Sequence, residues 1–239
     1  MQLYFIRHAQ SENNQKWSET GSSSGRVDDP GLTDVGKQQA QYLAGIVHLY
    51  RPDARLSPLN QINERSISVT HLYTSLMTRA ILTGDYLAEK TGLPLVSLVD
   101  AHEGGGIYLD DEGTGQQRGL PGKTPRELKS LSSHLVLPEI NSEGWWNRPY
   151  EEREERLSRG KRVLDWILSV HGATNDRIVL ISHADFFNYL LAAILKQDER
   201  PPVWFYLNNA GIARIDFFEG GTVLVYSNRT DHLPAELLT

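Results

Sequence analysis

Short apolar runs rich in strand-forming residues alternate with segments of helical periodicity along this chain, and this alternation limits its possible folds more than any other feature. We predict strands at residues 2–6, 68–74, 95–99, 177–182, 203–207, 212–218 and 222–226. We predict helices at residues 33–50, 76–90, 150–169 and 185–194. Strands that alternate with helices predict an α/β fold with a mainly parallel sheet, and Gly220-Gly221 predicts a hairpin turn at a late antiparallel edge.

Local features refine three of the predicted helices. Thr33 and Asp185 have side chains that accept hydrogen bonds from free backbone N–H groups, so each is predicted to cap the helix that it begins. Gly36 is a poor residue for a helix interior, and its presence there predicts a close contact that excludes a side chain. The charges of residues 152–159 include Glu–Arg pairs spaced four apart, which is typical of a solvated helix face.

Residues 101–148 interrupt the alternation, because glycine is frequent in them and helical or strand periodicity is weak. A segment of this length and kind inside a compact domain is typically a lid or a binding insertion. We therefore predict a cap insertion within a single domain that spans residues 1–239. Trp145 and Trp146 leave two interpretations open, because they can line a substrate pocket or anchor the cap.

The composition excludes several classes of protein. The 239 residues include no cysteine, which rules out disulfide scaffolds, cysteine-ligated metal sites and thiolate nucleophiles. The formal net charge is -6, so we predict neither a nucleic-acid nor a membrane-surface partner. The sequence has no secretory leader and no apolar run long enough to span a membrane, and we expect a soluble, cytoplasmic protein.

Charged and titratable side chains follow three of the predicted strands. Arg7 and His8 follow the first strand, His102 and Glu103 the third, and His183 the fourth. The carboxyl ends of parallel strands share one edge of a sheet, so we expect these side chains to converge on one cleft. A neutral imidazole can attack phosphorus, an arginine can neutralise phosphoryl oxygens, and a carboxylic acid can protonate a leaving oxygen. A lone histidine at a strand end is more often structural, so position alone leaves both roles open.

The sequence around these residues resembles a known family. Ile6–Asn14 is similar to the Arg-His-Gly signature of the histidine phosphatase superfamily, the group that contains cofactor-dependent phosphoglycerate mutase. Leu32–Ala40, Tyr73–Thr83 and Ile181–His183 resemble three further motifs of that family, and Glu103 matches its acid/base position. Five matches in the family's order identify the chain as a member. The resemblance implies a three-layer α/β/α sandwich with a mainly parallel sheet and a small cap insertion.

The resemblance also implies a role for each matching residue. His8 would attack the substrate phosphorus and become phosphohistidine, and Glu103 would protonate the leaving group and then activate water. The phosphoryl oxygens would be bound by Arg7, Asn14, Arg79 and His183. The scheme requires no organic cofactor and no metal, and the sequence has no close-spaced ligand set such as H-E-x-x-H. Without the resemblance, Arg79 would be interpreted as a helix-surface arginine and Asn14 as a loop asparagine.

Several positions depart from the family's pattern. Ala9 stands where glycine is usual, and the added methyl group could crowd the backbone near the phosphate or make no difference. Ala184-Asp185 follows the second histidine, where glycine is frequent. Residues 19–29 and 51–65 look longer than in the mutases. Ser24–Arg26 therefore match substrate contacts of the family only loosely.

One stretch favours a phosphatase over a mutase. The residues after Glu103 are acidic and lack the lysine of the mutase motif, which favours water as the acceptor of the phosphoryl group. Lys123 and Arg126 can reach a distal anionic group or remain exposed at a helix start. We predict hydrolysis of a small phosphorylated metabolite, with phosphoglycerate mutase-type phosphotransfer as the alternative and a homodimer left open. A non-catalytic module that binds a phosphorylated ligand is disfavoured, because the catalytic set is intact.

Overall fold

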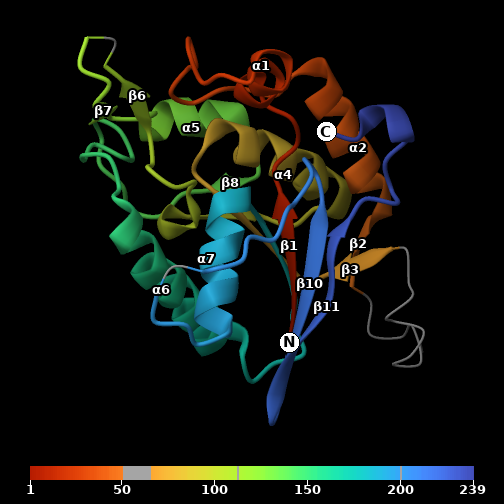
Figure 1. Ribbon diagram of the computed structural model, residues 1–239. Helices are drawn as coiled ribbons and strands as arrows, with labels where there is room; N and C mark the ends of the chain where they lie inside the picture. Colours follow the sequence, from red (N-terminus) through yellow and green to blue (C-terminus); the bar gives the residue numbers. More distant parts are fainter. Residues whose placement is uncertain (51–65, 112, 200) are drawn as a thin grey trace.

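A computed structural model describes residues 1–50, 66–111, 113–199 and 201–239 of the chain. In these residues seven strands form one sheet in the order β11-β10-β1-β9-β4-β5-β8 (Figure 1). The strands are β1 (Gln2–Arg7), β4 (His71–Ser75), β5 (Leu95–Leu98), β8 (Leu135–Val136), β9 (Arg177–Ser182), β10 (Ile212–Phe218) and β11 (Gly221–Arg229). The helices are α1 (Glu12–Thr20), α2 (Asp34–Ile46), α4 (Thr78–Thr91), α5 (Pro125–Leu131), α6 (Arg153–His171) and α7 (Ala184–Ile194). The stretch at 51–65 lies outside the described residues.

The sheet is mainly parallel, as the sequence predicts. β1, β9, β4, β5 and β8 run in one direction, and β10 and β11 form the antiparallel edge. β1 and β9 pair in register along their whole length, with Arg7 opposite Ser182. Because the two strands end at the same level, His8 and His183 follow them at the same edge of the sheet.

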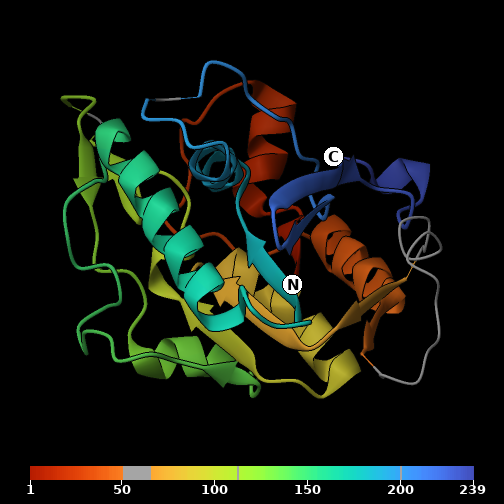
Figure 2. The ribbon, with the colours of Figure 1, turned by 90° about the horizontal axis from the view of Figure 1, so that it is seen from below.

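Helices cover both faces of the sheet, which confirms the three-layer sandwich (Figure 2). Successive side chains of a strand point to opposite faces. Leu3 and Phe5 of β1 pack with α6 and α7, whereas Tyr4 and Ile6 pack with α2 and α4. Burial of both faces explains why the central strands are continuous apolar runs rather than alternating ones. Within the described ranges, no helix combines the length and apolar character needed to cross a membrane.

Residues 101–148 lie mostly over the carboxyl edge of the parallel strands (Figure 1). They contain α5 and a hairpin of β6 (Tyr108–Asp110) and β7 (Gln117–Gly119). Their later part also contributes β8, which pairs with β5 at the end of the central sheet. The segment predicted as a cap thus also supplies an edge of the core.

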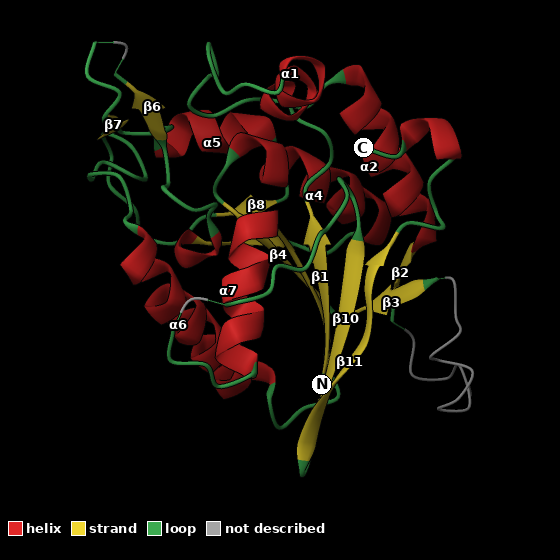
Figure 3. Ribbon diagram, viewed as in Figure 1, coloured by secondary structure: helices red, strands yellow, loops and turns green. Residues whose placement is uncertain are grey.

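Three predicted elements differ in the structure. The strand predicted at 68–74 is divided between β3 (Ile67–Val69) and β4, which belong to different sheets. The helix predicted at 33–50 ends at Ile46, because the chain then forms β2 (Val47–Leu49), which pairs in parallel with β3 (Ile67–Val69). The prediction of a strand at 203–207 is wrong, since these residues form a loop (Figure 3). The Asn188 side chain hydrogen-bonds the N–H and the carbonyl of Phe205, so a side chain replaces the ladder that a strand would need.

Helix α1 has no counterpart among the predicted helices. None of its residues is buried, so it lacks the apolar stripe by which a helix is recognised in a sequence. Its signal is local: Ser11 caps it and forms a reciprocal capping box with Asn14. Thr33 caps α2 as predicted, and a side chain on Gly36 would collide with the carbonyl of Gln10, which confirms the close contact predicted there.

The prediction that Asp185 caps α7 is wrong, because His183 occupies the N-cap position. The carboxylate of Asp185 instead pairs with Arg156 of α6 at 3.1 Å. The interpretation of residues 152–159 as a solvated face is also wrong in part. Arg156 and Arg159 are only 7% and 1% exposed, and both turn toward Glu151, which precedes the helix.

Candidate active site

His8 follows β1 and is 2% exposed. Its Nδ1 lies 2.7 Å from the carbonyl oxygen of Ala9, and its Nε2 accepts a hydrogen bond from Nε of Arg79 at 3.1 Å. Since a guanidinium can only donate, Nε2 carries no proton and Nδ1 holds it. Burial, followed by the charges of Arg79 and Arg7, lowers the pKa of His8 well below its usual range. The ring is therefore neutral near pH 7, with its lone pair on Nε2.

Side chains of α2 and α4 hold the residues that follow His8. The N–H of Ala9 donates to Oγ1 of Thr83 at 3.0 Å, and the N–H of Gln10 donates to Oε1 of Gln39 at 2.7 Å. The methyl group of Ala9 is buried in a small apolar cluster, so the structure accommodates alanine where the family usually has glycine. Gln39 and Thr83, which belong to the matched motifs, therefore hold the loop that follows β1 in place.

Two arginines approach His8 from different elements. Arg79 lies in the first turn of α4 and is 8% exposed. Arg7 ends β1 and donates from Nη1 to the carbonyl of Leu207 at 2.6 Å. Burial lowers the pKa of both guanidinium groups, and the charge of Glu103 opposes this. Arginine stays protonated at any working pH, so the two side chains give the site a fixed positive charge.

His183 lies at the N-cap of α7 and is fully buried. Its Nε2 is 2.9 Å from the hydroxyl of Ser75, while its Nδ1 has no hydrogen-bond partner in the described part of the chain. Its ring centroid is 5.1 Å from that of His8. Burial, then the charges of Arg79 and His8, lowers its pKa well below the usual range. If the Ser75 hydroxyl donates to Nε2, the neutral ring keeps an N–H on Nδ1 for an incoming anion.

Asn14 lies in the first turn of α1 with its amide fixed by hydrogen bonds. Its Oδ1 accepts from the N–H and the hydroxyl of Ser11, at 3.1 and 2.9 Å, and from Nδ2 of Asn209 at 3.1 Å. Asn209 also donates to the carbonyl of His8 at 3.1 Å and is 2% exposed. Sequence reasoning did not find Asn209, because an asparagine in a loop before a strand is typical of any turn.

Glu103 is half-buried and follows the 3₁₀ helix η1 (Val99–Ala101). Its Oε1 accepts a hydrogen bond from the N–H of Gly104 at 3.1 Å. A side chain on Gly104 would meet the ion pair of Asp185 and Arg156, which packs directly against this turn. Asp185 therefore places a second carboxylate near Glu103. Burial, followed by the charge of Glu103, raises the pKa of Asp185 to about 6.

Arg159 of α6 anchors the segment that carries Glu103. Its Nη1 donates to the carbonyls of Asp100 and His102 at 2.8 and 2.9 Å. Its Nε and Nη2 bind the two carboxylate oxygens of Glu151 at 2.5 and 2.8 Å. This bidentate pair has planar geometry and little freedom to move, so it holds the turn before Glu103 in one place.

A cavity of about 210 Å³ opens at this edge of the sheet. Of the residues predicted to form the site, those that line it are His8, Asn14, Arg79 and Glu103. Arg7 and His183 are not among the lining residues, but the charge of Arg7 and the ring of His183 both act on His8. The structure thus brings the predicted set together at the ends of β1 and β9.

The outer wall of the cavity comes from α1, the loop after it and β6. Arg26 stacks on the ring of Tyr108 with 4.1 Å between the guanidinium carbon and the ring centroid. Lys16 donates to the carbonyl of Gly25 at 2.6 Å, and Trp17 is 59% exposed beside it. The entrance therefore combines positive charge with aromatic surface.

Other candidate residues lie outside this cavity. Lys123 forms an ion pair with Asp29 at 3.0 Å, and Arg126 is exposed on α5. Trp145 and Trp146 are 5% and 4% exposed and belong to the core on the α4 face of the sheet. Of the two interpretations of these tryptophans, the structure supports the anchor, because neither ring lines the cavity.

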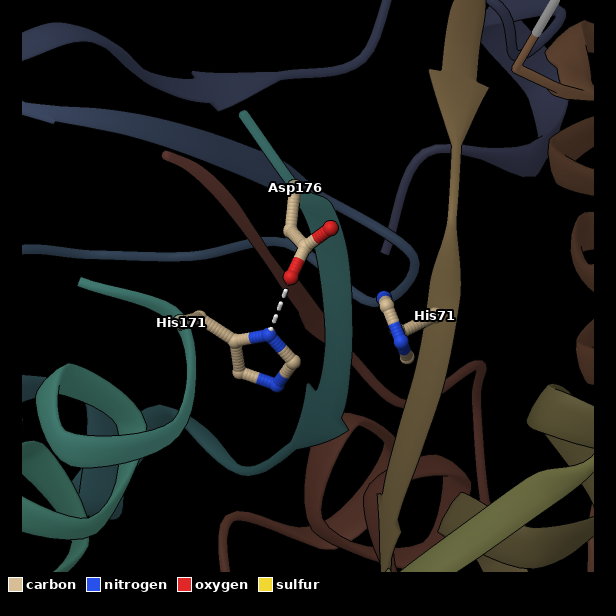
Figure 4. Close-up of side chains that lie close together, drawn as sticks. All are labelled: His71, His171 and Asp176. Atoms are coloured by element: carbon tan, nitrogen blue, oxygen red, sulfur yellow. Dashed lines mark hydrogen bonds and ion pairs between the residues drawn. The ribbon is translucent and has the colours of Figure 1, made fainter. Parts of the chain in front are cut away.

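Away from this site, the described residues contain a cluster with metal-ligand chemistry. His71, His171 and Asp176 have ligand atoms within 4.8 Å of one another, at the opposite edge of the sheet where β4 and β9 begin (Figure 4). His171 uses Nδ1 for Asp176 at 2.7 Å and Nε2 for the hydroxyl of Tyr73 at 2.9 Å. Because both ring nitrogens of His171 are engaged, we interpret the cluster as a hydrogen-bond network that joins α6 to the sheet.

Two curated proteins are similar in sequence to this chain. A probable phosphatase of Schizosaccharomyces pombe is 24% identical over 234 residues, which cover 95% of this chain and 69% of the relative. A probable phosphoglycerate mutase of Salmonella choleraesuis is 24% identical over 258 residues, which cover 100% of this chain and 97% of the relative. Both align along almost the whole of this chain.

Solved structures share the fold. A phosphoserine phosphatase of Entamoeba histolytica has a TM-score of 0.58 at 22% identity, over 98% of this chain and 99% of its own. A mycobacterial glucosyl-3-phosphoglycerate phosphatase has a TM-score of 0.58 at 17% identity, over 98% of this chain and 99% of its own. The family profile of the histidine phosphatase superfamily (branch 1) matches residues 3–230. With the motifs, the fold and this match in agreement, the chain belongs to branch 1 of the histidine phosphatase superfamily.

Proposed function

We propose that this protein hydrolyses a phosphomonoester through a phosphohistidine formed on Nε2 of His8. The observation that carries the proposal is a buried, neutral imidazole whose unprotonated Nε2 meets the guanidinium of Arg79 at the wall of a cavity. A neutral ring nitrogen is a competent nucleophile once its approach is fixed. The nearby arginines supply the charge that phosphoryl oxygens need in the transition state.

In the first step, Nε2 of His8 forms a bond to phosphorus while the bond between phosphorus and the ester oxygen breaks. The phosphoryl oxygens are bound by Arg7, Asn14, Arg79 and His183. Protonated Glu103 gives its proton to the leaving oxygen, so an alcohol departs rather than an alkoxide. In the second step, Glu103 takes a proton from water, which attacks phosphorus and releases His8 and inorganic phosphate.

Water is favoured as the second acceptor over a retained phosphoglycerate. A mutase must hold its product through a second set of cations until the phosphoryl group returns. Here Lys123 is neutralised by Asp29, and the stretch after Glu103 brings Asp110 and Asp111 instead of a lysine. The cavity of about 210 Å³ suits a small phosphorylated metabolite.

The test of the nucleophile is to trap the intermediate. The protein is mixed with a ³²P-labelled phosphomonoester and quenched within milliseconds. We expect an acid-labile, base-stable adduct that is absent in His8→Ala and present in His48→Ala, since His48 is exposed on β2. If the wild-type protein acquires no label and also fails to hydrolyse aryl phosphates, the proposal is contradicted. Transfer of the label from the protein to added phosphoglycerate would favour the mutase alternative.

The role of Glu103 is tested by the leaving group. Glu103→Gln should slow the hydrolysis of alkyl phosphates by at least about a hundredfold, because these leaving groups need a proton. Aryl phosphates, which leave without one, should be slowed much less. Glu139→Gln is the matched control, since Glu139 is exposed and is not among the residues that line the cavity. Equal slowing of both ester classes would remove Glu103 from the acid role.

A further inference from the structure

After β11, residues 233–239 cross to α2 and to the loop before β10, and we refer to them as the C-terminal strap (Figure 1). The strap contains the short helix η2 (Ala235–Leu237) and is held in place by Leu233 and Leu237, which are 8% and 6% exposed. None of its residues lines the active-site cavity. Its polar contacts nevertheless lead to the nucleophile.

Two buried amide side chains receive the strap. Nε2 of Gln39 donates to the carbonyl of Leu237 at 2.7 Å and to the hydroxyl of Thr239 at 2.9 Å. The backbone N–H of Asn209 donates to the carbonyl of Thr239 at 2.9 Å. The Thr239 hydroxyl donates to the side-chain Oδ1 of Asn209 at 3.2 Å. Thr239 thus links the two amides through a single hydroxyl group.

The opposite ends of the same two amides hold the catalytic loop. Oε1 of Gln39 accepts from the N–H of Gln10 at 2.7 Å. Nδ2 of Asn209 donates to the carbonyl of His8 and to Oδ1 of Asn14, both at 3.1 Å. Gln39 and Asn209 are 0% and 2% exposed, so water cannot replace a lost partner without rearrangement.

The strap fixes which end of each amide faces the loop. If Gln39 were flipped, its NH₂ group would meet the N–H of Gln10, and donor would face donor. The strap prevents this, because the carbonyl of Leu237 can only accept and therefore requires the NH₂ end of Gln39, which also donates to the Thr239 hydroxyl. The hydroxyl of Thr239 donates to the oxygen of Asn209, and the NH₂ of Asn209 donates to the carbonyl of His8, which can only accept, so both contacts favour the same orientation.

The backbone beside Asn209 supports the same interpretation. Ala210 adopts a φ of 56°, a conformation that costs an alanine about 1 kcal/mol or more. In this conformation its N–H donates to the carbonyl of Arg7 at 3.1 Å and lies 3.3 Å from that of His8. The backbone of Ala210 is therefore strained where the hydrogen bonds of the strap reach the end of β1.

We propose that the C-terminal strap is a positioning element for the nucleophile, acting through Gln39 and Asn209 on His8 and Asn14. Thr239 is its central positioning residue. The inference rests on the proposed function for its effect on rate, while its effect on the loop is independent of any activity. Removal of the Thr239 hydroxyl takes one of two strap acceptors from Gln39 and the strap donor from Oδ1 of Asn209, so it should loosen both amides and let the loop after His8 relax.

The test compares Thr239→Val with wild type. We expect kcat for an aryl phosphate to fall about tenfold or more while KM changes less than twofold, because a small displacement of the nucleophile slows the chemical step. Thr239→Ser, which keeps the hydroxyl, should restore the rate. Thr222→Val, an exposed threonine of β11, is the matched control and should leave it unchanged. A kcat within twofold of wild type in folded Thr239→Val would overturn the proposal.

A second measurement separates this inference from the proposed function. Hydrogen exchange of the Gln10 amide, followed by NMR, should be faster in Thr239→Val than in wild type or Thr222→Val, because its acceptor Gln39 loses one of its two hydrogen bonds to the strap. If the wild type hydrolyses no phosphate ester, the proposed function fails. The exchange rate of the Gln10 amide still shows whether the strap positions the loop after His8. Unchanged exchange, even with a lower Tm, would assign the strap a purely structural role and overturn the inference.

Discussion

At the scale of single residues, one hydrogen bond between Arg79 and His8 combines two tasks. The guanidinium Nε donates to the ring Nε2 at 3.1 Å, which keeps that nitrogen free of a proton. Its positive charge also adds to burial in lowering the pKa of His8. In the proposed reaction the same charge would also stabilise the phosphoryl oxygens, so activation of His8 and stabilisation of the anion would depend on one side chain.

Arg79→Gln should therefore change both protonation and rate. With the positive charge removed, the pKa of His8 is expected to rise toward its ordinary value, because a protonated ring is no longer repelled. Hydrolysis should fall by at least about a hundredfold. The pKa is measured by ¹⁵N NMR titration of the ring, with Arg126→Gln as the exposed control. An unchanged titration curve would show that burial alone sets the protonation of His8.

At the scale of elements, α6 does more than cover the sheet. Its buried Arg159 binds Glu151 and two carbonyls of the segment before Glu103, so the helix face that meets the core is partly ionic. A buried ion pair is expensive to desolvate, and its loss on one side leaves an uncompensated charge. The pair therefore couples the packing of α6 on the sheet to the position of the turn that carries Glu103.

Arg159→Leu should cost about 3–5 kcal/mol of the free energy of unfolding, because Glu151 would remain buried without its bidentate partner, with Arg156 as a more distant cation at 3.8 Å. The double variant Glu151→Leu/Arg159→Leu should recover a large part of this loss. Urea unfolding measures both, and Arg153→Leu is the control, since Arg153 is exposed at the start of α6. A single variant as stable as wild type would mean that the pair makes no net contribution.

At the scale of the whole molecule, buried neutral histidines tie stability to pH. Burial is the first cause of the lowered pKa at His8, His102, His183 and His232. An unfolded chain binds a proton at each of these groups near pH 6.5, whereas the folded chain resists it. The unfolded state thus holds more protons below that pH, so the free energy of unfolding must decrease as the pH falls.

His232 gives this effect a measurable window. Burial lowers its pKa to about 4, so its contribution is complete above pH 6.5 and declines until the pH reaches about 4. The loss amounts to roughly 3 kcal/mol at most. His232→Gln should flatten the curve of unfolding free energy against pH in this window, and His48→Gln, at an exposed site, should not. Parallel curves for wild type and His232→Gln would refute the assignment.

The sequence by itself determined the sheet and the principal residues at its edge. Short continuous apolar runs followed by helical segments predict strands buried on both faces, and parallel strands end at one edge whatever the details of packing. That is why His8 and His183 could be placed together, although they lie far apart in the sequence. The family motifs added Arg79 and Asn14, which periodicity alone leaves as ordinary surface or loop residues, and they assigned Glu103 the acid/base position.

Only the tertiary structure decided which polar side chains support this edge. Each of these side chains depends on a partner from another segment. Arg159 is buried against Glu151, Asp185 forms an ion pair with Arg156 instead of capping α7, and Asn209 donates to Asn14. Gln39 binds Leu237, 198 positions away, through an atom that no local pattern distinguishes. Hydrophobic periodicity records which face of an element is buried, whereas a hydrogen bond is specified by the exact meeting of two distant groups, and a single sequence does not encode that meeting in any local pattern.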